Sequence, residues 1–146
     1  MAVLIENRQK SRRLNLRRIK RDLNRALLSL GLQRSELSIV FVGDAEMRKL
    51  NRLYRQIDRT TDVLSFPLTE TGFPRPGDPL GDIVVSMPKA TAQAAEYGVS
   101  LRDEILRLLV HGLLHLVGYD HERNTYQKRR MQKKERELLD AVAQVD

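Results

Sequence analysis

Apolar residues follow two kinds of pattern in the first part of the chain. Between residues 10 and 30 they recur at the spacing of one buried helix face, and Gly31 is a natural stop. Residues 3–5 and 37–42 are instead short, nearly continuous apolar runs of strand length. The pattern therefore predicts a strand, a long helix and a second strand, in that order.

The same alternation continues through the middle of the chain. Asp44 is expected to cap a second helix, and residues 63–66 and 82–87 are expected to form two more strands. Residues 69–81, between those strands, are rich in proline and glycine. We expect this segment to be a loop that serves as a lid or recognition arm.

Three further helices are predicted towards the C-terminus. Pro88 suits the first turn of a helix that runs to about Tyr97 and ends at Gly98. Ser100 is the expected cap of the next helix, and residues 122–142 form a heavily charged last one. Strands and helices in this mixed order predict an α+β fold, with a small four-stranded mixed sheet flanked by about five helices.

Composition limits the class of protein. The chain has 146 residues, 41% of them apolar and 31% charged, as expected of one globular domain spanning residues 1–146. It contains no cysteine, so a transition-metal site would have to use histidine and carboxylate ligands. The first apolar run precedes its charges, unlike a signal peptide, and no segment is apolar enough to span a membrane. We therefore expect a cytoplasmic protein with no membrane association.

The charge is positive overall and unevenly distributed. The formal net charge is +7, which favours attraction to polyanions such as nucleic acid. Basic side chains with few acids among them crowd the first predicted helix, and we expect contact with RNA phosphates from Arg12, Arg13, Arg17, Arg18, Lys20 and Arg21. A solvated surface is the alternative explanation. Aromatic residues make up only 5% of the chain, so an extensive stacking platform is not expected.

The histidines are confined to one segment. His111, His115 and His121, which are all the histidines of the chain, fall within HGLLHLVGYDH. Residues four apart share one helix face, so His111 and His115 can both direct an imidazole nitrogen at one metal ion. Gly118 is placed to end the helix in a left-handed turn that returns His121 as a third ligand. Three nitrogens with one open coordination position are typical of a catalytic zinc site.

The residue after the first histidine limits the kind of bond that the site is expected to hydrolyse. The spacing His-x-x-x-His-x-x-Gly-x-x-His is that of the zincin-like helix of the metzincin proteases, but Gly112 replaces their general base, a glutamate. A metal-bound water would still be available as a nucleophile, so hydrolysis is expected and peptide hydrolysis is disfavoured. Gly112 would also let a substrate or a neighbouring element approach closely.

Three segments together resemble the YbeY family of bacterial rRNA-maturation endoribonucleases: HGLLHLVGYDH (residues 111–121), TDVLSFP (61–67) and LGDIVVS (80–86). The resemblance spans nearly the whole chain. It implies a single-strand-specific, metal-dependent endoribonuclease that acts in 16S rRNA 3′-end maturation and late ribosome quality control. The implied partners are single-stranded rRNA segments, the small ribosomal subunit and its assembly proteins.

The resemblance also implies which residues act. The family's three metal-binding histidines correspond to His111, His115 and His121, and its functionally important arginine corresponds to Arg55. A guanidinium can share the negative charge that gathers on a phosphodiester during hydrolysis, so Arg55 is a candidate catalytic residue. Asp120 is a second candidate, because it can orient a histidine or accept a proton from water. Zinc is the expected metal, with nickel or another divalent ion as the alternative.

Three interpretations follow from these observations. The favoured one is a metalloribonuclease in which a metal-bound water attacks RNA phosphodiesters, although the RNA 2′-hydroxyl is also compatible as the attacking oxygen. The second is a non-catalytic ribosome-assembly or RNA-binding factor whose metal is structural. The third is a metalloprotease, against which Gly112 argues.

Overall fold

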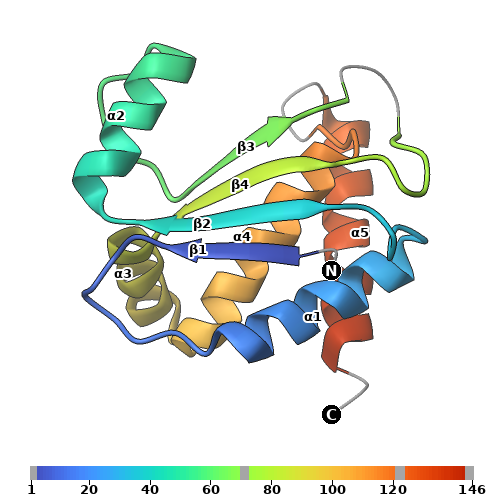
Figure 1. The fold of residues 1–146 in the computed structure, drawn as a ribbon, viewed down its shortest axis with the longest axis horizontal. Helices are drawn as coiled ribbons and strands as arrows, with labels where there is room; N and C mark the ends of the chain where they lie inside the picture. The colour runs from blue at the N-terminus through green and yellow to red at the C-terminus, as the bar shows by residue number, and fades with distance from the viewer. Residues whose placement is uncertain (1–2, 70–72, 121–123, 144–146) are drawn as a thin grey trace.

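The fold is that of a computed structural model, which describes residues 3–69, 73–120 and 124–143. The helices and strands, shown in Figure 1, follow one another in the order β1 (Val3–Asn7), α1 (Leu16–Ser29), β2 (Leu37–Val42), α2 (Asp44–Arg55), β3 (Val63–Pro67), β4 (Gly81–Ser86), α3 (Met87–Tyr97), α4 (Leu101–Leu116) and α5 (Thr125–Ala143). The expected α+β class is confirmed.

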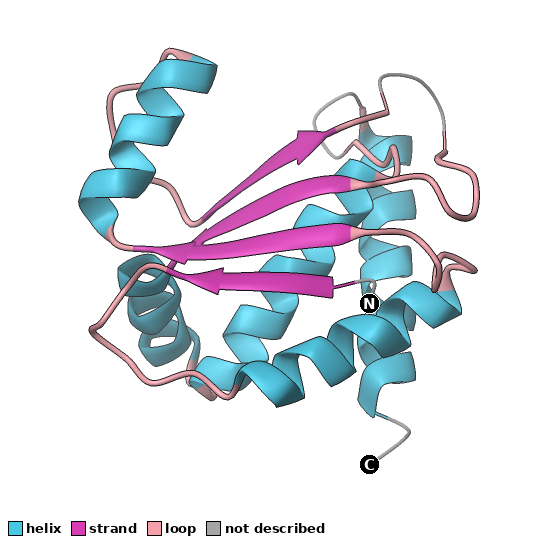
Figure 2. Ribbon diagram, viewed as in Figure 1, coloured by secondary structure: helices cyan, strands magenta, loops and turns pink. Residues whose placement is uncertain are grey.

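The strands form one mixed sheet in the order β1-β2-β4-β3. β1, β2 and β4 run parallel, whereas β3 pairs antiparallel with β4 (Figure 2). Parallel neighbours need a crossover connection, and α1 supplies it between β1 and β2. The sheet therefore has two different edges, β1 beside its crossover helix and β3 with its antiparallel partner, and it matches the small four-stranded mixed sheet that the sequence predicts.

The central strands bury side chains on both faces of the sheet. Ile39 and Phe41 of β2 belong to the main core, while Val42 belongs to a smaller cluster with Met47 of α2. Alternate side chains of a strand point to opposite faces. Helices α1, α3, α4 and α5 gather on the main-core side and α2 stands on the other (Figure 1). Cover on both faces explains why β2 is almost continuously apolar.

The first helix is shorter than its apolar spacing predicts. α1 begins at Leu16 and not near Lys10, because the side chain of Asn15 accepts a hydrogen bond from the backbone N–H of Arg18 at 3.1 Å and caps the helix there. Before the cap, the buried side chain of Gln9 both donates to and accepts from the backbone three residues further on. The prediction is therefore wrong for the segment that precedes Asn15.

Two further boundaries differ from prediction by one residue. Gly43 is the N-cap of α2, and Asp44 is its first residue. Asp44 Oδ1 instead accepts hydrogen bonds from Thr60 Oγ1 at 3.3 Å and Ser86 Oγ at 3.2 Å. Ser86 also caps α3 by accepting from a backbone N–H, so Met87 starts that helix and does not end the strand before it.

The last helix packs against α1 and α4. Asn124 Oδ1 accepts a hydrogen bond from the Gln127 backbone N–H at 2.8 Å, as an N-cap side chain does, and α5 follows from Thr125. Residues 122–123, where the predicted helix starts, lie outside the described residues. Of the helices that the structure describes, none has the length and apolar character needed to cross a membrane.

Candidate active site

Helix α4 carries the first two histidines along the main-core side of the sheet. Ser100 caps the helix by accepting a hydrogen bond from the Asp103 N–H at 3.0 Å, and Gly98 ends the preceding helix with φ of 66°. Both features match the prediction. α4 contacts β3, β4, α3 and α5, and His111 and His115 lie one turn apart in its C-terminal half.

Gly112 is required by close packing between α4 and the sheet. A Cβ atom at this position would lie 2.9 Å from Ile83 Cγ2 and 3.1 Å from Ser65 Oγ. The Ser65 hydroxyl also donates a hydrogen bond to the Gly112 carbonyl at 3.1 Å, which joins β3 directly to α4. The expectation that Gly112 lets a neighbouring element approach closely is confirmed. This contact holds His111 and His115 close to β3.

A groove of about 720 Å³ lies beside β3. Its lining comes from the end of α2, from β3 and the residues before it, from the end of α3, and from α4 with the turn that follows. The lining residues are Arg55, Thr61, Asp62, Val63, Leu64, Ser65, Pro67, Tyr97, Arg107, Leu108, His111, His115, Gly118, Tyr119 and Asp120. The fold thus brings four of the candidate residues, Arg55, Asp120, His111 and His115, into one groove.

The two histidine rings converge. His111 Nε2 and His115 Nε2 are 3.2 Å apart, and the ring planes are inclined at 76°. Two nitrogens that each bind one tetrahedral zinc ion at about 2.0 Å would be separated by about 3.3 Å. The third expected ligand, His121, lies outside the described residues. Within the described part of the chain there is no group of three side chains placed to hold a metal ion.

The other nitrogen of His111 has a partner that the sequence analysis did not single out. His111 Nδ1 lies 2.7 Å from Glu135 Oε1, which comes from α5. A carboxylate at this nitrogen favours the tautomer with the proton on Nδ1, in which Nε2 can act as a ligand. The only signal in the sequence is an acid within a basic helix, and that pattern does not indicate a partner 24 residues away.

The two candidate catalytic residues enter the groove from different elements. Arg55 is exposed at the C-terminal end of α2, where Gln56 adopts the left-handed conformation with φ of 58°. Gln56 is the one non-glycine residue with positive φ in the described part of the chain, and such local strain is common near functional sites. Asp120 is half-buried in the turn after α4.

A second arginine lines the groove and was missed by the sequence analysis. Arg107 donates hydrogen bonds from Nε and Nη2 to the buried carboxylate of Glu104 at 2.9 and 2.6 Å. Gln93 of α3 donates to the same carboxylate at 2.7 Å. Hydrogen bonding to Glu104 raises the pKa of the Arg107 guanidinium above its ordinary value. The guanidinium is therefore fixed in orientation at the edge of the groove.

The six basic residues expected to contact RNA lie elsewhere. Arg12 and Arg13 precede α1, the other four belong to it, and none of them lines the groove. α1 contacts β1, at the opposite edge of the sheet from β3. Contact between these side chains and phosphates therefore stays a prediction, and it would involve an RNA segment outside the groove.

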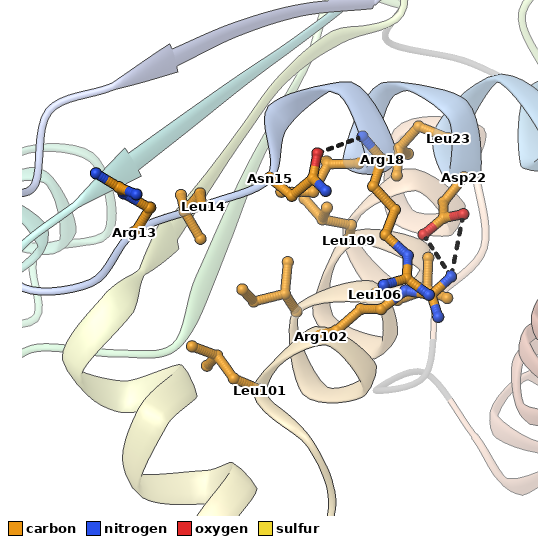
Figure 3. A pocket seen from close by; sticks show the side chains of 12 residues that line it. Arg13, Leu14, Asn15, Arg18, Asp22, Leu23, Leu101, Arg102, Leu106 and Leu109 are labelled. Atoms are coloured by element: carbon orange, nitrogen blue, oxygen red, sulfur yellow. Dashed lines mark hydrogen bonds and ion pairs between the residues drawn. The ribbon is translucent and has the colours of Figure 1, made fainter.

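Two of those basic residues line a different cavity, of about 210 Å³, between α1 and α4. Figure 3 shows Arg18 and Arg102 reaching towards Asp22, with Arg13 on the other side of the cavity. Arg102 Nη2 lies 3.3 and 3.5 Å from the two carboxylate oxygens of Asp22. Most of the remaining lining is leucine and isoleucine, so this cavity is largely apolar.

The predicted lid or recognition arm is described only in part, since residues 70–72 lie outside the described residues. Its described portion reaches the turn after α4: the Phe73 ring packs edge-on against the Tyr119 ring, with 5.5 Å between centroids. Because Tyr119 lines the groove, Phe73 lies next to it. A role as a lid stays a prediction.

Comparison with known proteins places this chain in a family. Residues 4–143 match the family model described as Endoribonuclease YbeY. The chain is 42% identical over 141 residues to Endoribonuclease YbeY of Geobacter metallireducens, covering 95% of this chain and 94% of that protein. It is 40% identical over 146 residues to Endoribonuclease YbeY of Aquifex aeolicus, covering 93% and 95%.

A solved structure has the same fold. The solution structure of TM1509 from Thermotoga maritima aligns with a TM-score of 0.70 and 29% sequence identity, over 96% of this chain and 88% of that one. Together with the match over nearly the full length, this similarity leads to one conclusion. The chain belongs to the YbeY endoribonuclease family.

Proposed function

We propose that the groove beside β3 is the active site of a metal-dependent endoribonuclease that cuts single-stranded RNA. Membership of the YbeY family makes the chain an endoribonuclease, that is, a hydrolase of RNA phosphodiester bonds. One observation above all supports this site: His111 Nε2 and His115 Nε2 lie 3.2 Å apart in a groove that Arg55 also lines. Imidazole and guanidinium groups facing one groove suit a phosphodiester substrate.

The donor set fits zinc. His111 and His115 would hold the ion with a nitrogen separation close to the tetrahedral value, and we propose His121 as the third ligand. A bound zinc ion would supply a Lewis acid that withdraws negative charge from the phosphate. Imidazole ligands also suit nickel, so elemental analysis of the purified protein is the measurement that identifies the metal.

Arg55 is proposed to bind the non-bridging oxygens of the phosphate under attack. A guanidinium presents several N–H donors in one plane, in a geometry that matches two phosphate oxygens at once. Arg55 at the end of α2 and His111 on α4 line the same groove. Negative charge that develops on a phosphate bound there would then be stabilised by Arg55.

Asp120 is proposed to accept the proton from the attacking oxygen or to orient a histidine. Of the described residues that line the groove, Asp62 and Asp120 carry carboxylates. Asp62 Oδ1 accepts a hydrogen bond from the Val63 backbone N–H at 2.8 Å, which holds it against its own strand. Asp120 immediately precedes the proposed ligand His121, and this favours it for the role.

We further propose that the substrate is the 3′ end of 16S rRNA within the small ribosomal subunit. The family resemblance supports this substrate, and the net charge of +7 supports binding to RNA. Assembly proteins of the subunit are the accompanying partners. Cleavage of subunits that carry an unprocessed 3′ end, compared with mature subunits, tests the substrate directly.

Metal removal tests the activity. Cleavage of a labelled single-stranded RNA by the full-length protein is expected to stop on chelation and to resume with added zinc. Arg55→Gln is expected to lower kcat by about 100-fold, because a donor to the transition state is lost. Arg48→Gln is the matched control, since Arg48 is on the same helix but pairs with Asp58 outside the groove.

Two results would contradict the proposal in different ways. Undiminished cleavage by the chelated protein would show that the histidine site does not serve the reaction. RNA binding without any cleavage by the wild-type protein would instead support the non-catalytic RNA-binding factor, in which His115→Ala lowers the melting temperature and RNA affinity together.

A further inference from the structure

One end of the groove presents an aromatic ring that has no part in the proposed cleavage. Tyr97 is the last residue of α3 and is 54% exposed. The other tyrosine in the groove, Tyr119, packs edge-on against Phe73 and has the guanidinium of Arg130 over its ring at 5.6 Å. Tyr97 is therefore the groove tyrosine with more surface available to a further stacking partner.

Arg107 lies beside that ring. Its guanidinium carbon is 5.6 Å from the centroid of the Tyr97 ring, and 40% of its side chain is exposed. On α4, Arg107 comes one turn before His111, about 6 Å along the helix axis. That offset is of the same order as the separation of successive phosphates in a nucleic acid strand. A strand with one phosphate at His111 would therefore bring a neighbouring phosphate to Arg107.

The pair of Arg107 and Glu104 carries no net charge, so we expect it to contribute to ligand binding by holding the guanidinium in one orientation. Glu104 occupies Nε and Nη2 of the guanidinium, and an arginine has five N–H donors in all. The remaining donors are held in a fixed plane, and such a preorganised group loses little conformational entropy when it binds a phosphate.

We propose that Tyr97 and Arg107 form a nucleotide subsite next to the cleavage position. An unpaired RNA base stacks on the Tyr97 ring, and the adjoining phosphate accepts hydrogen bonds from Arg107. This subsite rests on the proposed function, because it takes the RNA strand along the groove past His111. A ring beside a guanidinium is the combination with which single strands are bound.

The subsite would select single strands without selecting sequence. Every base has a face that can stack, so Tyr97 would accept any of them. A base that is stacked and paired within a duplex does not offer that face to a protein side chain. The subsite would therefore place an unpaired strand in register with His111 and leave a duplex of the same sequence uncut.

Substitution of Tyr97 tests the stacking. Tyr97→Leu is expected to raise KM for a short single-stranded RNA by about 10-fold, with kcat changed less than about twofold, because the subsite binds ground and transition states alike. Tyr97→Trp is expected to restore the wild-type KM. Tyr126→Leu, at a 67% exposed tyrosine outside the groove, is the matched control and should leave KM unchanged.

A spectroscopic signal separates stacking from a general loss of binding. The fluorescence of a single 2-aminopurine in the RNA falls when that base stacks. We expect the fall on binding to the full-length wild-type protein, with chelator present so that the RNA stays intact, and on binding to Tyr97→Trp. Tyr97→Leu at saturating concentration should not produce it, and equal quenching by Tyr97→Leu would overturn the stacking contact.

The arginine contact has its own measurement. Arg107→Gln alone would leave the buried Glu104 carboxylate without its arginine, so the double variant Glu104→Gln/Arg107→Gln is used. Its affinity for a short single-stranded RNA is expected to fall by about 10-fold, because the charge-assisted hydrogen bonds from the guanidinium to the phosphate are lost. An unchanged affinity in the double variant would overturn the phosphate contact.

The possible results separate a failure of the subsite from a failure of the proposed function. If the wild-type protein cleaves and Tyr97→Leu cleaves with the same KM, the subsite is wrong and the proposed function stands. If the wild-type protein binds RNA without cleaving it, the proposed function is wrong. The 2-aminopurine signal and the RNA affinity of the double variant then decide the subsite by themselves.

Discussion

Helix α4 carries two arginines that are each paired with a buried carboxylate, one beside the groove and the other beside the apolar cavity. Arg107 lines the groove and pairs with Glu104 of the same helix at 2.6 and 2.9 Å. Arg102 lines the apolar cavity and pairs with Asp22 of α1 at 3.3 and 3.5 Å. The two arginines are five positions apart, so they point about 140° apart around the helix.

The two pairs differ in what they hold in place. The Glu104 pair is local and short, and it orients a cation towards a groove that also contains His111. The Asp22 pair joins α1 to α4 across 80 residues of sequence, above a cavity lined mainly by leucine and isoleucine. We expect the Glu104 pair to serve ligand binding and the Asp22 pair to serve stability, and the following substitutions test that division.

The largest effect is expected from Arg102→Met. It leaves the Asp22 carboxylate buried, with Arg21 Nε 4.0 Å from Asp22 Oδ1. Breaking a buried ion pair from one side is strongly unfavourable, so we expect the free energy of unfolding to fall by about 3 kcal/mol in urea denaturation. RNA cleavage per folded molecule should not change. A loss of cleavage without a loss of stability in Arg102→Met would contradict the proposed difference between the two arginines.

Glu135→Ala is expected to weaken metal binding by about 10- to 100-fold, because it removes the partner that holds the proton on His111 Nδ1. Competition with a chromophoric chelator measures the affinity. Glu135→Gln should retain most of it, since an amide oxygen still accepts that hydrogen bond. Glu137→Ala is the matched control: Glu137 is on the same helix but pairs with Lys134. Equal affinity for Glu135→Ala and wild type would exclude the positioning role.

Gly112→Ala is expected to reduce stability by about 1 kcal/mol, measured by thermal or urea unfolding. The added Cβ would press on Ile83 Cγ2, a methyl group close to the strand backbone, and overpacking of this kind is unfavourable by about 1–3 kcal/mol. The better helix propensity of alanine offsets up to about 1 kcal/mol of that. A stabilised variant would mean that α4 can move away from β3 without loss.

The smallest effect is expected from Arg17→Gln/Arg21→Gln on α1, far from the groove. We expect no change in KM for a short oligonucleotide that fills only the groove. For a long RNA that can also reach α1, affinity should fall by about threefold at physiological salt, as for exposed charges. A larger loss with the short oligonucleotide would mean that the basic helix belongs to the cleavage site after all.

Much of this molecule could be predicted from patterns among near neighbours in the sequence. The apolar run of β2, the Ser100 cap and the Gly98 stop all appear as expected. His111 and His115 required only the knowledge that residues four apart share a helix face. The start of α1 was mispredicted because its position depends on a cap and on the side chain of Gln9, neither of which has a helical period.

The partners of the groove residues could not be predicted in the same way. Glu135 reaches His111 only because α5 packs on α4, and Tyr97 meets Arg107 only because α3 does. Those contacts depend on how the whole core fills space, and no local period records them. The sequence by itself thus determined the elements and the histidine face of α4, because both arise from neighbours along the chain. Tertiary structure alone decided which distant carboxylate and ring flank that face, because helix packing brings them there.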